Sequence, residues 1–148
     1  KDDGFIVLYC QPMIYSKFSD KTNGITLFRT DKSYWTPDFI LKSINYNGKT
    51  KYAILDAKWR PRRNVDFKEM VFKYVYSISN LNNDAEKPFM WILQGKEDGE
   101  SHVCFHNRGC ISKKQGNKFV YESGIVKVTP KSGNEKLINI LNVFLGEE

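Results

Sequence analysis

The chain has 148 residues, 41% of them hydrophobic and 14% aromatic, which is enough to bury the core of one domain and excludes a low-complexity chain. The chain has 23 Lys and Arg residues against 17 Asp and Glu, so its formal charge is +6, which favours a polyanionic partner without requiring one. No apolar run reaches the roughly 20 residues that cross a bilayer, and no signal peptide is visible, so we expect a cytoplasmic protein that does not enter membranes.

The cysteines bear on the cellular compartment of the protein, and the first residue bears on whether the chain is part of a longer protein. Cys10, Cys104 and Cys110 are scattered and odd in number, which favours reduced thiols over a disulfide framework. Because the chain begins with Lys1 rather than methionine, we expect residues 1–148 to be a single domain taken from a longer protein.

Apolar runs of strand length alternate with amphipathic stretches, which predicts an α/β fold with a mixed central sheet flanked by helices. Pro12 in the first run indicates a sheet edge or a bulge. We expect a hairpin within residues 34–63, further strands at 5–15, 25–29, 89–94, 101–105 and 121–129, and a basic loop at 108–118.

Apolar residues at helical spacing predict two helices. The first begins at Asp66, an N-cap with Glu69 three residues later as in a capping box. The last begins at Asn134 or Glu135 and stops at Gly146. Since a strand, the first helix and another strand follow in order, we expect strand 89–94 to run parallel to the second hairpin arm. The first helix carries the stripe Phe67, Met70, Tyr74, Ile78 and Leu81.

The hairpin within residues 34–63 has two possible registers. A two-residue turn at 47–48 would set Asp38 across from Ala57. Since directly opposed residues share a face and neighbours alternate, Asp38 would then point away from Asp56.

A three-residue loop at 46–48, with Gly48 in the left-handed region, gives the other register. It sets Asp38 directly across from Asp56, with their Cβ atoms roughly 5 Å apart. Because this register brings the two acids together, we predict the bulged loop, or an equivalent bulge nearer Asp38. The loop pairs Asn45 with Lys49, and the register also pairs the apolar residues Phe39 with Leu55 and Ile40 with Ile54.

Two carboxylates and a lysine on neighbouring strands suggest metal-assisted phosphodiester chemistry. Asp38 and Asp56 would repel each other unless a cation lies between them, which favours a hard ion such as Mg²⁺, with the Ala57 carbonyl as a further ligand. Lys58 would orient the attacking water or offset charge on phosphorus. The alternative is a pair of surface acids and an edge lysine with no shared role, because a three-residue pattern also arises by chance.

The whole arrangement resembles the PD-(D/E)xK nuclease superfamily. Pro37-Asp38, seventeen intervening residues and Asp56-Ala57-Lys58 after an apolar run carry this resemblance. The phrases TPDFIL, ILDAKWR, KYVYS and SGIVKVTP look most like the nuclease domain of McrC-type restriction subunits. The resemblance implies a restriction-endonuclease-like αβββαβ core, Mg²⁺ replaceable by Mn²⁺, and DNA as substrate in restriction or phage defence. It also implies Asp38 and Asp56 as ligands, Lys58 as the catalytic lysine, and an AAA+ NTPase or a second copy of the chain as partner.

The chain departs from that pattern in two ways. Many relatives have an acidic residue on a helix before the first strand, which is not evident here. Many also have a glutamine on the helix after the motif, where Lys73 is the nearest substitute. Lys73 either contacts nucleic acid or is a solvated lysine paired with Glu69. The competing functions are an inactive nucleic-acid-binding or scaffolding domain, and a nuclease that acts on RNA.

Two other clusters suggest binding. Trp59, Arg60, Arg62 and Arg63 follow the motif and are expected to hold the phosphate backbone, unless this basic loop contacts nothing. A zinc site is the weaker alternative to partly buried strand residues, because one tetrahedral ion would not easily take more than two ligands from a strand at that spacing. Its candidates are His102, Cys104, His106 and Cys110.

Overall fold

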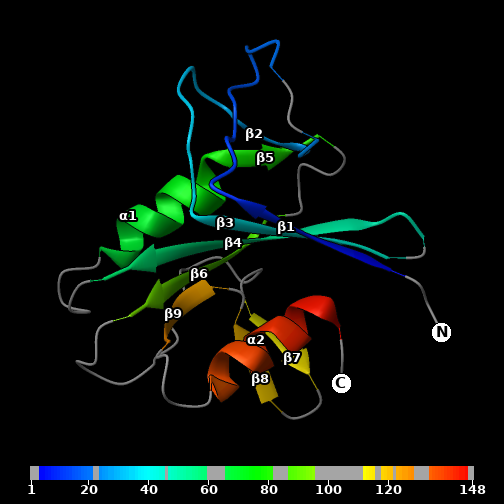
Figure 1. Ribbon diagram of the computed structural model, residues 1–148, viewed down its shortest axis with the longest axis vertical. Coiled ribbons are helices and arrows are strands. Elements are labelled where there is room, and N and C mark those ends of the chain that lie inside the picture. Colours follow the sequence, from blue (N-terminus) through cyan, green and yellow to red (C-terminus); the bar gives the residue numbers. More distant parts are fainter. Residues whose placement is uncertain are drawn as a thin grey trace.

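A computed structural model describes residues 4–21, 24–45, 47–59, 66–81, 87–95, 112–115, 118–121, 123–128 and 134–146 (Figure 1). Its centre is a five-stranded mixed sheet in the order β1-β3-β4-β6-β9. β1, β3 and β4 pair antiparallel, whereas β6 and β9 continue the sheet in parallel with β4. The expected mixed α/β fold and the parallel partner of the second hairpin arm are therefore confirmed. The strands are Phe5–Cys10 (β1), Phe39–Ile44 (β3), Thr50–Lys58 (β4), Phe89–Gln94 (β6) and Ser123–Lys127 (β9).

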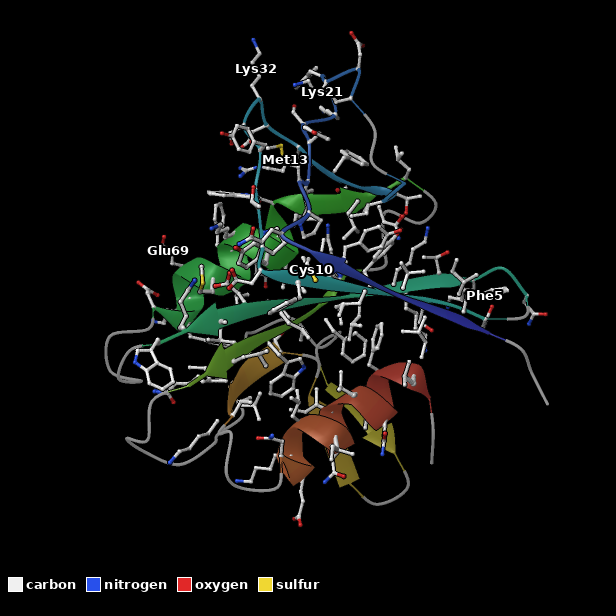
Figure 2. All side chains as sticks on the ribbon, in the orientation of Figure 1. Phe5, Cys10, Met13, Lys21, Lys32 and Glu69 are labelled. Atoms are coloured by element: carbon white, nitrogen blue, oxygen red, sulfur yellow. The ribbon has the colours of Figure 1, made fainter. Side chains whose placement is uncertain are left out.

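Helices cover both faces of this sheet (Figure 1), and side chains fill the space between them and its strands (Figure 2). On one face lie α1 (Phe67–Val71), the π-helical turn η2 (Phe72–Tyr76) that continues it, and a two-stranded pair of β2 (Leu27–Arg29) with β5 (Ile78–Asn80). On the other face lies α2 (Glu135–Leu145).

The central strand β4 is buried on both sides, as its continuous apolar run predicted. Tyr52 and Ile54 belong to the core on the α1 side, whereas Ala53 and Leu55 belong to the core on the α2 side. This alternation fixes which face every β4 side chain occupies, since successive residues of a strand point to opposite faces.

The hairpin has the bulged loop that the sequence predicted. β3 and β4 pair Phe39 with Leu55 and Ile40 with Ile54. Asn45 N–H donates to the Lys49 carbonyl at 3.0 Å, and Gly48 has a φ of 73°. A glycine is favoured there because this left-handed conformation costs other residues free energy.

The first helix is shorter than predicted. Asp66 is its N-cap and accepts a hydrogen bond from Glu69 N–H at 2.9 Å, which confirms the predicted start. The expected continuation to residue 81 is wrong, because the helical turn η2 is capped at Ser77 and the chain enters β5 at Ile78. Ile78 is buried on that strand and Leu81 is exposed, so the apparent helical period ran on by coincidence.

The first strand is also shorter than expected. Only the first part of residues 5–15 is a strand, because β1 ends at Cys10 and Gln11 has a positive φ of 48°. Gln11 N–H still donates to the Asp38 carbonyl at 2.7 Å. Pro12, which has no N–H to give to a sheet, follows. β1 is an edge strand, as the proline indicated.

The predicted strand 121–129 is confirmed by β9 (Ser123–Lys127), and Tyr121 ends a separate strand. β8 (Lys118–Tyr121) pairs with β7 (Ser112–Gln115), whereas β9 joins the main sheet. The expected loop 108–118 was wrong where β7 and the start of β8 form, because lysine-rich edge strands do not show an apolar period. The predicted strand 101–105 lies outside the described residues. At the C-terminus, α2 begins after Asn134 and ends at Gly146 with a φ of 81°, as predicted.

Candidate active site

Asp56 is a buried carboxylate near the end of β4. Only 3% of its surface is exposed. Its Oδ1 accepts a hydrogen bond from the Tyr74 hydroxyl at 3.1 Å, and its Oδ2 forms an ion pair with Lys58 Nζ but accepts no hydrogen bond of regular geometry. A carboxylate is almost never this buried without partners, and Tyr74 and Lys58 are the partners of Asp56.

Asp38 lies on the same face of the sheet as Asp56. It immediately precedes β3, and extending the β3–β4 register by one residue sets it across from Asp56. Ile40, two residues on, packs in the α1-side core, so the side chain of Asp38 is directed to that side as well. Its Oδ2 accepts a hydrogen bond from Ala57 N–H at 2.7 Å. The two acids therefore converge at one end of the hairpin.

Lys58 is more exposed to solvent than Asp56, its partner on β4. It alternates with Asp56 on β4, and its side chain is 21% exposed where that of Asp56 is 4% exposed. Its carbonyl accepts a hydrogen bond from Gly95 N–H at 3.2 Å, which ties the end of β4 to the end of β6. Ala57, between the two charged residues, is exposed. The carboxylates thus lie at the boundary between core and solvent.

Trp59 continues from this edge and is 76% exposed. Gly95 lies directly beneath its ring, since a Cβ built on that glycine would be 2.3 Å from the Trp59 ring. One face of the indole is thereby supported by backbone while the side chain remains open to solvent. The other predicted phosphate contacts, Arg60, Arg62 and Arg63, lie outside the described residues.

Lys73 reaches the same region from η2. Its Nζ lies 4.2 Å from the centre of the Trp35 ring and 4.7 Å from that of Tyr74. Burial lowers the pKa of Lys73 from its ordinary value of 10.5, the nearby charge of Asp56 opposes this shift, and Lys58 adds to it. The charge of Asp56 therefore acts on Lys73, in addition to that of Glu69, the partner that a solvated helix lysine would have.

Tyr74 is a site residue that sequence reasoning treated only as core. Burial raises its pKa far above the ordinary value of 10.0, and the charge of Asp56, the hydrogen bond to Asp56 and the charge of Asp38 add to that shift. Its hydroxyl is therefore a hydrogen-bond donor at every physiological pH. The apolar stripe of the helix hid this role, because a tyrosine on such a stripe is ordinarily packing.

The donor set is of the kind that holds Mg²⁺. Two carboxylates and the Ala57 carbonyl are hard oxygen ligands, and Mg²⁺ in proteins is often bound by one or two carboxylates with water completing its shell. A cation would meet Asp56 Oδ2 where Lys58 now forms its ion pair. No group of three or more His, Cys, Asp or Glu residues gathers within the described part of the chain, and the zinc candidates at 102–110 lie outside it.

Within the described ranges, no helix is both long and apolar enough to cross a membrane. Comparison with protein-family models, curated proteins and solved structures found no significant match.

Proposed function

We propose that this chain is a divalent-metal-dependent endonuclease that hydrolyses DNA phosphodiester bonds. The observation that carries the proposal is the meeting of two acids from separate strands, one of them almost fully buried, with a lysine at a solvent boundary. Burying one carboxylate beside a second lowers the stability of the folded protein, and carboxylates in such surroundings are concentrated at functional sites.

Each side chain has a distinct part in the proposed reaction. Mg²⁺ held by Asp38 and Asp56 would polarise the scissile phosphate and lower the pKa of an attacking water. Tyr74 fixes the Asp56 carboxylate through its hydrogen bond. Lys58 moves from Asp56 towards the phosphate and offsets the negative charge that develops on its oxygens. Trp59 offers an exposed aromatic surface on which a base or sugar stacks.

The order of elements also supports a PD-(D/E)xK assignment. β1, β3 and β4 form an antiparallel unit, a helix follows, and β6 returns parallel to β4. From the first strand onward, this is the succession that a resemblance to that superfamily implies, with Asp38 next to β3 and Asp56 on β4. Membership of the McrC-type group, a role in restriction or phage defence, and an AAA+ NTPase partner belong to the same proposal.

A second candidate is a domain that binds nucleic acid without cutting it. The observation in its favour is that both acids are engaged by the protein itself, Asp38 by Ala57 N–H and Asp56 by Lys58 and Tyr74. In this alternative the ammonium of Lys58 replaces a metal ion as the counter-charge. The difference lies in whether a divalent cation displaces Lys58 from Asp56.

Plasmid cleavage in Mg²⁺ or Mn²⁺ separates the two candidates. The wild type should cut DNA, while Asp56→Asn and Lys58→Ala should lose activity by at least about a hundredfold, as loss of a catalytic group does. Asp20→Asn and Lys68→Ala are matched controls, because they remove the same charges from exposed positions. A wild-type protein that binds DNA but never cuts it in either metal supports the second candidate. Cleavage of RNA alone would change the substrate class.

A further inference from the structure

Arg29 is an unusual buried cation close to the candidate active site. It ends β2 with only 3% of its surface exposed, and its Nη2 forms an ion pair with Asp31. Its Nε and Nη1 are buried and have no hydrogen-bond acceptor within the described residues. The guanidinium instead lies over the Trp35 ring, 4.0 Å from its centre.

Trp35 adds a third unused donor and connects Arg29 to Lys73. Its Nε1 is buried and likewise lacks an acceptor in the described part of the chain. Lys73 Nζ lies 4.2 Å from the centre of the same ring, so both cationic groups contact one indole. The resulting cluster of Arg29, Trp35 and Lys73 is rich in donors and poor in acceptors.

The unused donors point to the kind of ligand that would complete this cluster. The charges of Arg29 and Lys58 act on Lys73, and those of Asp56 and Glu69 oppose them. Asp56 is paired to Lys58, and Asp31 is paired to Arg29. An oxyanion supplies several acceptors and negative charge at once, which is what three unused N–H donors and a lysine require.

We propose that Arg29, Trp35 and Lys73 form a phosphate-binding subsite that takes a backbone phosphate next to the one held at the two carboxylates. Arg29 is its buried member, and Lys73 and Trp35 are its partly exposed members. The location of the subsite beside the cleavage centre rests on the proposed nuclease function. Binding of a phosphate there does not, because it needs neither metal nor turnover.

The test is the affinity of a short labelled DNA duplex, measured by fluorescence anisotropy in Ca²⁺ over a range of salt concentrations. Lys73→Gln should weaken binding by about tenfold at low salt and reduce the slope of log K against log salt by about 0.9, as loss of one phosphate contact does. Lys68→Gln removes the same charge from an exposed position on α1 and should change neither quantity. Trp35→Phe keeps an aromatic ring and loses the Nε1 donor, so its affinity should fall several-fold.

Equal affinities and salt slopes for Lys73→Gln, Lys68→Gln and the wild type would overturn the subsite. Duplexes with a 5′-phosphate and with a 5′-hydroxyl identify the source of the phosphate. Equal binding of the two assigns an internal phosphodiester, whereas preference for the 5′-phosphate assigns a strand end, and both outcomes support the subsite. Absence of cleavage by the wild type would refute the nuclease proposal while leaving this binding comparison valid.

Discussion

The substitution Tyr74→Phe tests how much the Tyr74 hydroxyl stabilises the buried carboxylate of Asp56. The substitution removes one hydroxyl and keeps the ring, so the core is not left with a large cavity. What is lost is the hydrogen bond to Asp56 Oδ1 at 3.1 Å, between two side chains that are almost entirely buried. Hydrogen bonds to charged groups contribute about 1.5–3 kcal/mol to stability, whereas neutral ones contribute about 0.5–1.5 kcal/mol.

We therefore expect Tyr74→Phe to lower the free energy of unfolding in urea by about 2 kcal/mol. Tyr52→Phe is the matched control, because among the described residues the Tyr52 hydroxyl forms hydrogen bonds only with neutral groups of Thr26, at 3.0 Å, and its loss should cost about 1 kcal/mol. In an Asp56→Asn background the cost of Tyr74→Phe should fall to that of the control. If Tyr74→Phe costs no more than Tyr52→Phe, or costs the same with Asn at position 56, the hydroxyl does not stabilise the charge.

Three further predictions concern the surroundings of the site. Gly95→Ala places a Cβ against the ring of Trp59, so the exposed indole must move and DNA affinity should fall several-fold in an anisotropy assay, with an unfolding free energy within about 0.5 kcal/mol of the wild type. Gly124→Ala makes the same kind of contact with Trp91, but this ring is buried, so urea unfolding should show a loss of about 1–3 kcal/mol with DNA affinity unchanged. The pKa of Lys73 lies below 10.5 in the folded protein, so between that lowered pKa and 10.5 the unfolded chain binds more protons than the folded one. Over this range the free energy of unfolding of the wild type, relative to that of Lys73→Gln, should therefore rise with pH. A Trp59 ring that does not move in Gly95→Ala would contradict the first prediction, and an unchanged free energy of unfolding in Gly124→Ala would contradict the second. A stability that falls with pH would contradict the third.

The hairpin was the part of the fold that sequence predicted best. Its register follows from local rules, because Gly48 permits a left-handed loop residue and the apolar residues of both arms must share a face. Once the register is set, the placement of Asp38 and Asp56 on one face follows without any knowledge of the rest of the chain.

Elements defined by distant partners were predicted less well. The run of residues 78–80 fits a helical stripe, yet it becomes β5 because β2 offers it an antiparallel partner. The segment 118–127 divides between two sheets because β8 pairs with β7 and β9 pairs with β6. Nothing local to either segment encodes such a partner, so propensity and period alone do not separate the alternatives.

The same limit applies to the site. Asp38, Asp56 and Lys58 stood out because charges interrupt apolar strands there. Arg29, Trp35 and Tyr74 did not, because a buried arginine contact or a tyrosine hydroxyl bond appears only when separate elements are packed together. Lys73 was noticed by its position on the helix, but its coupling to Asp56 required the tertiary structure.

The central claim is that Asp38 and Asp56 together hold a divalent cation. A crystal soaked in Mn²⁺ and measured for anomalous scattering tests it most directly. We predict an anomalous peak bound by both carboxylates, with Lys58 Nζ displaced from Asp56, and no peak in an Asp56→Asn crystal. A soaked crystal in which Lys58 stays paired to Asp56 and no peak appears beside either acid would contradict the account.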